Sequence, residues 1–268
     1  MAVRKLSNGI TLSYHDSGSG TPILFLHSFG HNKNLWLPQL THFLEKGFRV
    51  LAPDMPGHGG SSYDPALHGV DQMARCYIEL LDTLEIRKTI LAGISMGGYI
   101  ALRMWARRPD LLAAMVLSNT KAENDSDEIV ARRRAQIANI HENGLEHFVT
   151  TGAPKRLSPV TLERRPWVLD IIKLLNYTVP AEVNAATLEA MARKEDDTKV
   201  LATIDVPVLV IAGSDDIFIP RDSPGNLHRG IKGSRFHEIA GTGHVSSLEA
   251  PTEYNRVMEE FLQSAGLM

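Results

Sequence analysis

The chain is poor in cysteine and in long apolar runs. Its 268 residues include one cysteine, Cys76, so no disulfide can form within the chain. No apolar run reaches the roughly 18 residues that a membrane-spanning helix needs. The first residues, MAVRKLSNGITL, lack the apolar segment of a signal peptide. We therefore expect a cytoplasmic protein without a membrane partner.

An excess of positive charge is also missing. The formal net charge is −3 and the isoelectric point is about 6.4, whereas nucleic-acid-binding proteins usually present a basic stripe. We interpret the one basic cluster, Arg132 to Arg134, as a solvated helix face, so no nucleic-acid partner is expected. Hydrophobic residues make up 43% and charged residues 22%, which indicates a globular protein with a sizeable core.

Strand-like and helix-like segments alternate along most of the chain. The apolar run VPVLVIA at residues 206–212 has no polar alternation, which predicts a strand buried on both faces. The alternation indicates an α/β fold with a mostly parallel central sheet flanked by helices on both faces. Strands are expected at residues 10–14, 23–26, 50–53, 89–92, 114–117, 206–211 and 235–239. Helices are expected at residues 35–44, 70–84, 97–107, 222–227 and 252–263.

The alternation stops between residues 121 and 199. This stretch has helical periodicity, many charges and turn signals at Gly152-Ala153-Pro154 and Ser158-Pro159, but no strong strand pattern. We expect a helical cap over residues 121–199, inserted into a core formed by residues 1–120 and 200–268.

A serine lies in a glycine-rich turn between an expected strand and an expected helix. Gly93-Ile94-Ser95-Met96-Gly97 matches G-x-S-x-G, and it lies between a strand and a helix, the context in which this motif marks a nucleophile. A sharp turn would expose the Ser95 hydroxyl at the carboxyl edge of the sheet, where ligands bind in α/β folds. An incidental serine is the alternative. Nucleotide-binding loops are excluded, since their glycine and lysine signatures are absent. We predict a nucleophile at Ser95.

A serine nucleophile needs a base, and the base needs an orienting acid. His244 follows the last expected strand in AGTGHVSSLEAP and would project over the same edge, so we predict it as the base. Asp215 and Asp216 follow the buried strand in AGSDDIFIP, and one of them is expected to face the histidine. His27 and His31 are four residues apart, but no Glu-bearing zinc helix surrounds them, so no metal site is expected.

Acyl transfer also needs donors for the negative oxygen of its intermediate. The N–H of Met96, directly after the serine, is expected to supply one donor. We assign the other to the N–H of Phe29, in the loop after the strand at residues 23–26, because the small Ser28 lets that backbone approach.

With these motifs, the chain resembles the α/β-hydrolase superfamily. The resemblance extends over the whole chain except the details of the insertion, and the order serine, acid, histidine matches. It implies Asp216 as the acid, His244 as the base, and Phe29 and Met96 as the oxyanion donors. The usual His-Gly of the first loop is His27-Ser28 here. The motifs that carry the resemblance are LHSFG at 26–30, DMPGHGGSS at 54–62, GISMGG at 93–98, GSDDIFIP at 213–220 and GHVSSLEAP at 243–251.

The chain looks most like carboxylesterases and 3-oxoadipate enol-lactonases. The resemblance implies a serine carboxylesterase that hydrolyses small, short-chain carboxylic esters through an acyl-enzyme and needs no cofactor. An enol-lactonase or related lactonase is the alternative, and C–C bond hydrolases and cofactor-free perhydrolases share a similar triad. A hydrolase-fold ligand-binding protein with little turnover is a further alternative.

Specificity is expected to come from the cap and from the loops that face the serine. An apolar pocket would favour short acyl or alkyl groups, whereas a substrate carboxylate would require an arginine, and the sequence does not decide whether Arg133 points inward. The residues expected to line the pocket are Leu37, Trp167, Ile171, Phe218 and Val245. The sequence gives no expectation for the oligomeric state.

Overall fold

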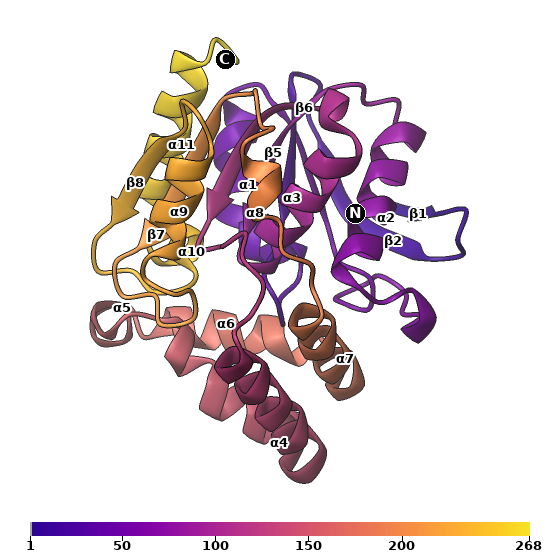
Figure 1. Ribbon diagram of the computed structural model, residues 1–268, viewed down its shortest axis with the longest axis vertical. Coiled ribbons are helices and arrows are strands. Elements are labelled where there is room, and N and C mark those ends of the chain that lie inside the picture. Colours follow the sequence, from indigo (N-terminus) through magenta and orange to yellow (C-terminus); the bar gives the residue numbers. More distant parts are fainter. Residues whose placement is uncertain (1) are drawn as a thin grey trace.

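An eight-stranded sheet forms the centre of the protein (Figure 1). The computed structural model describes residues 2–268. The strands are β1 (Ala2–Lys5), β2 (Thr11–Ser17), β3 (Pro22–Leu26), β4 (Arg49–Pro53), β5 (Thr89–Ile94), β6 (Leu112–Ser118), β7 (Val208–Gly213) and β8 (Arg235–Ile239). Their order across the sheet is β1-β2-β4-β3-β5-β6-β7-β8. Strand β2 runs antiparallel to both neighbours, and β3 to β8 pair in parallel.

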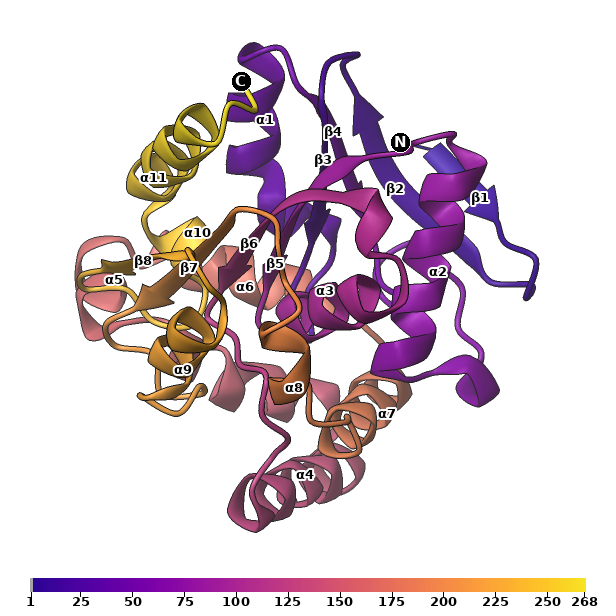
Figure 2. The same cartoon turned by 45° about the horizontal axis from the view of Figure 1, so that its top comes forward.

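Helices cover both faces of the sheet, as predicted (Figure 2). One face carries α1 (Leu37–Glu45), α10 (Ser246–Glu249) and α11 (Pro251–Ser264). The other carries α2 (Val70–Thr83), α3 (Met96–Arg107), α8 (Thr198–Leu201) and α9 (Ser223–Gly230). Short 3-10 helices are η1 (Lys33–Trp36), η2 (Pro65–Leu67), η3 (Pro109–Leu111) and η4 (Pro154–Arg156).

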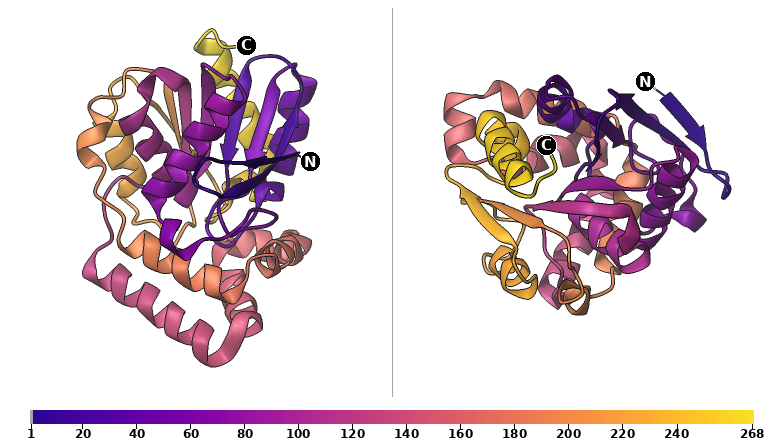
Figure 3. Two further views of the ribbon diagram at one scale, coloured as in Figure 1. Left: turned by 90° about the vertical axis from the view of Figure 1, so that its right-hand side faces the viewer. Right: turned by 90° about the horizontal axis from the view of Figure 1, so that it is seen from above.

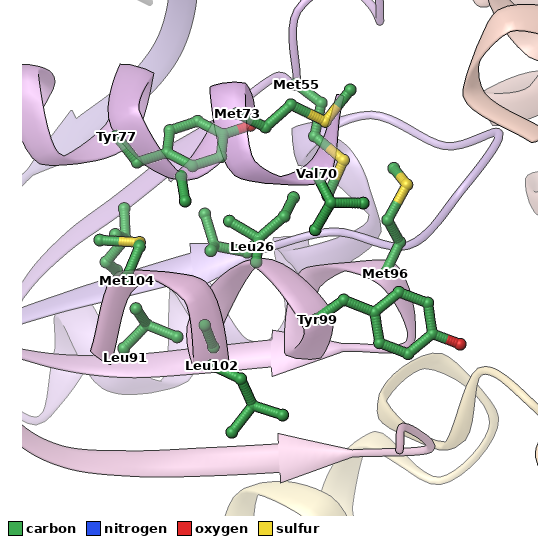
Figure 4. Close-up of a cluster of buried hydrophobic side chains, with 14 of the residues drawn as sticks. Leu26, Met55, Val70, Met73, Tyr77, Leu91, Met96, Tyr99, Leu102 and Met104 are labelled. Atoms are coloured by element: carbon green, nitrogen blue, oxygen red, sulfur yellow. The ribbon is translucent and has the colours of Figure 1, made fainter. Parts of the chain in front are cut away.

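The period-two geometry of the strands divides the core into two apolar clusters. In β3, Leu24 and Leu26 pack toward α2 and α3, whereas Ile23 and Phe25 pack toward α1 and α11. Figure 4 shows part of the first cluster, in which residues of α2 and α3 meet the sheet. All six residues of β7 are buried, which confirms the predicted two-sided burial of that strand.

The cap helices gather at one end of the sheet, where the parallel strands end (Figure 3). They are α4 (Asp127–Gly152), α5 (Pro159–Arg164), α6 (Trp167–Tyr177) and α7 (Ala181–Ala192). Helix α4 is interrupted at Gly144, whose φ of 78° is a conformation that glycine adopts at little cost. The cap therefore covers the carboxyl edge of the sheet, where ligands bind in this class of fold.

Strand β1 was not expected from the sequence. It lies at the edge of the sheet, and three of its four residues are exposed, so it lacks the apolar pattern on which the prediction of strands depended. No helix within residues 2–268 is long and apolar enough to cross a membrane.

Candidate active site

The turn between β5 and α3 holds Ser95 in an unusual backbone conformation. Its φ of 54° and ψ of −115° lie in a region that non-glycine residues rarely occupy, and such strain is typical of functional turns. A Cβ at Gly93 would collide with the carbonyl oxygen of Gly97, and one at Gly97 with that of Leu26. Both glycines of the motif are thus required for the chain to pass through this turn.

His244 lies next to the serine, as predicted. Its Nε2 is 2.8 Å from Ser95 Oγ. The loop that carries it is held by the buried carboxylate of Glu249, which accepts from the N–H of Gly243 at 2.8 Å. The backbone N–H of His244 donates to the carbonyl of Arg156 in the cap, also at 2.8 Å. Core and cap together therefore fix the position of the imidazole.

The structure distinguishes between the two candidate aspartates. Asp216 lies 2.9 Å from Nδ1 of His244 through Oδ2, whereas Asp215 is exposed. Asp216 also accepts from Asn119 Nδ2 at 2.9 Å and from the N–H of Phe218 at 2.8 Å. Burial opposes ionisation of Asp216, but the charge of His244 and these hydrogen bonds outweigh it and lower the pKa of the carboxyl. An ionised Asp216 selects the histidine tautomer that leaves Nε2 free to accept the serine proton.

Two backbone N–H groups near the serine are free to bind a negative oxygen. Met96 is the first residue of α3, where helix geometry leaves the N–H without a partner. Within residues 2–268, neither Met96 N–H nor Phe29 N–H donates to a protein acceptor. The loop of Phe29 is anchored on one side by the buried Lys33–Asp54 ion pair, with 2.5 Å between Nζ and Oδ2. On the other side, Arg156 Nη1 donates to the Phe29 carbonyl at 2.7 Å.

A cavity of about 40 Å³ lies between the serine and the cap. Its walls are Phe29, Ser95, Tyr99, Arg132, Arg133, Gln136, Arg156, Leu188, Met191, Phe218, Ile219 and His244. A wider groove of about 430 Å³ shares Arg132, Gln136, Arg156 and Phe218 with the cavity. We take the groove as the entrance to the cavity, because the shared side chains form the border between them.

The structure places one of the five predicted pocket residues in the cavity wall. Phe218 lines the cavity, with its ring centre 5.0 Å from that of His244. Leu37, Trp167 and Ile171 do not line it; they are 49%, 57% and 37% exposed. Val245 is fully buried in the core beside α11 and does not line it either. For Leu37, Trp167 and Ile171 the cause is that the sequence gives the helical period of α1 and α6 but not which face of each helix meets the core. Val245 directly precedes α10 and packs in the core.

The interpretation of the basic cluster was wrong for one of its residues. Arg134 is exposed, as predicted. Arg133 points into the cap, lines the cavity and pairs with the buried Asp125 at 2.5 Å. Lys121 pairs with the other oxygen of Asp125 at 2.8 Å. Arg132 lies on the border of cavity and groove.

His27 and His31 serve the loop structure. Nδ1 of His27 contacts the Ser28 carbonyl and Nε2 accepts from the N–H of Met55, both at 2.9 Å, which fixes a neutral ring. Burial lowers the pKa of His27 to about 4. Nδ1 of His31 is hydrogen-bonded to the Ser28 hydroxyl. Within residues 2–268, no three His, Cys, Asp or Glu side chains converge as metal ligands.

Several wall residues escaped the sequence analysis. Tyr99 follows the serine by one helical turn, so its position could have been inferred from the motif. Its hydroxyl points away from the other labelled side chains of the apolar cluster (Figure 4). Arg156 lies in a turn, GAPKRLSP, whose composition carries no functional signal. Leu188 and Met191, both on α7, resemble ordinary core residues in the sequence.

Comparisons with known proteins agree with this fold. The profile of the family described as alpha/beta hydrolase fold matches residues 21–251. An AB hydrolase superfamily protein of Bacillus subtilis, YisY, is 31% identical, with 97% of this chain and 98% of that protein covered. The 3-oxoadipate enol-lactonase 2 of Acinetobacter baylyi is 30% identical, with 95% and 94% covered. A malate-bound thermophilic esterase from Thermogutta terrifontis has a TM-score of 0.93 at 29% identity, with 99% of both chains covered. The chain thus belongs to the α/β-hydrolase family.

Proposed function

We propose that the protein hydrolyses small carboxylic esters through an acyl-enzyme on Ser95. The observation that carries this proposal is the unbroken hydrogen-bonded series from Ser95 Oγ through the His244 ring to Asp216, beside two unused backbone donors. A strained serine with this set of neighbours is suited to attack on a carbonyl carbon.

Each group has a defined step. His244 Nε2 takes the hydroxyl proton as Ser95 Oγ attacks the ester carbonyl, and the N–H groups of Phe29 and Met96 bind the resulting oxyanion. The imidazolium then protonates the departing alkoxide, which leaves the acyl group on the serine. A water molecule, deprotonated by the same nitrogen, releases the acid. Asp216 stabilises the imidazolium throughout these steps.

The size of the cavity supports short substrates. The cavity of about 40 Å³ beside the serine is much smaller than the groove of about 430 Å³, which favours a short acyl group next to Ser95. Longer groups would extend past Phe218 into the groove.

A lactonase is the second candidate, since a lactone is a cyclic ester and requires the same steps. Two observations favour it: the 30% identity to the Acinetobacter baylyi enol-lactonase, and the three arginines, Arg132, Arg133 and Arg156, in the cavity wall. An apolar ester would derive no benefit from these charges.

Parallel assays separate the candidates. We expect turnover of p-nitrophenyl acetate and butyrate, and a stoichiometric adduct of a fluorophosphonate on Ser95 that is absent from a Ser95→Ala control. A much higher kcat/KM for 3-oxoadipate enol-lactone would make the lactonase the main activity. Failure of Ser95 to form the adduct, with no turnover of either substrate, would instead favour a ligand-binding protein and reject both enzyme proposals.

A further inference from the structure

The cavity and its entrance have a charge opposite to that of the whole protein. The formal net charge is −3. Yet the cavity wall contains three arginines and, among its described residues, no aspartate or glutamate. The groove adds Lys155 and also has no acidic residue in its described wall. A small anion approaching the serine by this route meets attractive charge along the whole path.

The three arginines differ in how their charge is balanced. Arg133 is neutralised by Asp125, with Nε 2.5 Å from Oδ2. Arg132 and Arg156 form no ion pair within residues 2–268. Arg132 is exposed, so water solvates its charge. Arg156 is only 6% exposed, and a buried cation without an anion is costly.

The partners of Arg156 are all neutral. Nη1 donates to the Phe29 carbonyl at 2.7 Å, and the guanidinium carbon lies 5.3 Å from the centre of the Phe29 ring. Within residues 2–268, no other side-chain N–H of Arg156 has a hydrogen-bond acceptor. Burial lowers the pKa of Arg156 to about 10, so the side chain stays cationic at neutral pH. This residue of the cavity wall therefore carries an uncompensated charge and N–H donors that no protein acceptor within residues 2–268 uses.

We propose that Arg156, assisted by Arg132 at the entrance, binds a carboxylate that is part of the substrate. The inference rests on the proposed ester hydrolysis and names its substrate class: monoesters of short dicarboxylic acids, or lactones that carry a carboxylate. A guanidinium binds a carboxylate through two parallel hydrogen bonds, which fixes orientation as well as charge. Because Arg156 holds the residue whose N–H faces the oxyanion, the carboxylate lies only a few atoms from the reacting carbonyl.

The decisive comparison uses two substrates of equal shape. Monomethyl succinate carries a carboxylate where methyl 4-oxopentanoate carries a neutral methyl ketone. After each kcat/KM is divided by the rate of hydroxide hydrolysis of the same ester, we expect the anionic ester to be favoured on the order of 10- to 100-fold, the usual effect of a charge-assisted hydrogen bond. Added salt should reduce this preference.

Variants separate recognition from structural support. Arg156→Gln should bring the preference close to 1, and Arg132→Gln should reduce it severalfold. Loosening of the Phe29 loop would lower kcat/KM for both esters alike, so the ratio reports recognition alone. Arg132 is exposed and its side chain makes no hydrogen bond or ion pair within residues 2–268, so the folded structure should tolerate its replacement. Arg134→Gln is the matched control, because Arg134 lies on the same helix and lines neither cavity nor groove.

Binding to a Ser95→Ala protein tests the site without turnover. We expect calorimetry to detect monomethyl succinate and succinate at concentrations where methyl 4-oxopentanoate gives no heat, with inorganic phosphate as a second anion. Tighter binding of phosphate than of succinate would overturn the assignment to a carboxylate. A preference near 1 in the wild type, or one that Arg156→Gln leaves unchanged, would overturn it as well. Binding of monomethyl succinate without hydrolysis of any ester would reject the proposed function and retain the site.

Discussion

The two walls of the cavity are built in different ways. The wall from the α/β core places its reactive groups by backbone turns: the strained Ser95, the loop of His244 and the free N–H groups of Phe29 and Met96. The wall from the cap places side chains on helices and one short turn, and its polar character comes from arginines. In the function proposed above, backbone geometry therefore defines the reaction, whereas side-chain charge on the cap selects the substrate.

Removal of the proposed nucleophile should produce the largest loss of kcat, and it changes only the core wall of the cavity. We expect Ser95→Ala to lower kcat on the order of 10⁶-fold, as in measured triads. Circular dichroism should be unchanged, because alanine keeps the Cβ of serine and loses only the hydroxyl. A variant that keeps more than a hundredth of the activity would show that the reaction does not use this wall.

Replacement of the proposed acid, Asp216, should produce the second largest loss of kcat. Asp216→Asn is expected to lower kcat on the order of 10⁴-fold, because the amide favours the histidine tautomer that cannot accept the serine proton. Asp215→Asn is the matched control, one residue away and exposed, and should stay within about twofold of wild type. Equal losses in both variants would mean that the turn as a whole, and not the His244–Asp216 contact, supports activity.

Lowering the pH should destabilise the loops of the core wall before it affects the cap wall, because the arginines of the cap wall keep their charge. The pKa of His27 is about 4 in the folded protein and 6.5 in the reference state, so the unfolded chain takes up the proton first as the pH falls. The stabilisation by neutral His27 is complete above pH 6.5 and is lost between pH 6.5 and 4. Urea denaturation should show a loss of about 2 kcal/mol from this group between pH 7 and pH 5.

His68 sharpens this test because it connects the α/β core to the cap. Its Nε2 lies 2.8 Å from Thr187 Oγ1 on α7, and burial lowers its pKa to about 4. His68→Gln should therefore flatten the pH dependence of the free energy of unfolding. His141→Gln, at an exposed histidine of the cap, is the control variant.

The smallest effect is expected outside both walls. Trp167, the first residue of α6, is 57% exposed. Trp167→Ala should change kcat/KM less than about twofold and the free energy of unfolding by about 0.5 kcal/mol or less. Met191→Ala, at a buried residue of the cavity wall, should change kcat/KM for esters of longer acids. If Trp167→Ala altered substrate preference more than Met191→Ala did, Trp167 would have to be counted as part of the cap wall.

The same contrast explains what the sequence could predict. Strands β2 to β8, helices α1, α2, α3, α9 and α11, and the turns of Ser95 and His244 follow from apolar periods and from glycines that only a sharp turn requires. The choice of Asp216 over Asp215 followed only from the resemblance to α/β-hydrolases. The side chains of the cap wall could not be predicted, because the sequence of a helix that lies between the core and solvent does not show which of its faces points inward. For this reason Trp167 was assigned to the wrong side, and the solvated face expected for Arg132 to Arg134 did not hold for Arg133, whose inward direction the sequence left open.

Arg156 also has a consequence for engineering. Its carbonyl accepts from the backbone of His244, while its guanidinium holds the carbonyl of Phe29. We therefore expect a cap transplanted from a relative to bring its own substrate preference. It would also remove the two hydrogen bonds by which Arg156 holds the loops of His244 and Phe29. A working chimera needs its junction placed so that the host's own segment around residue 156 is retained.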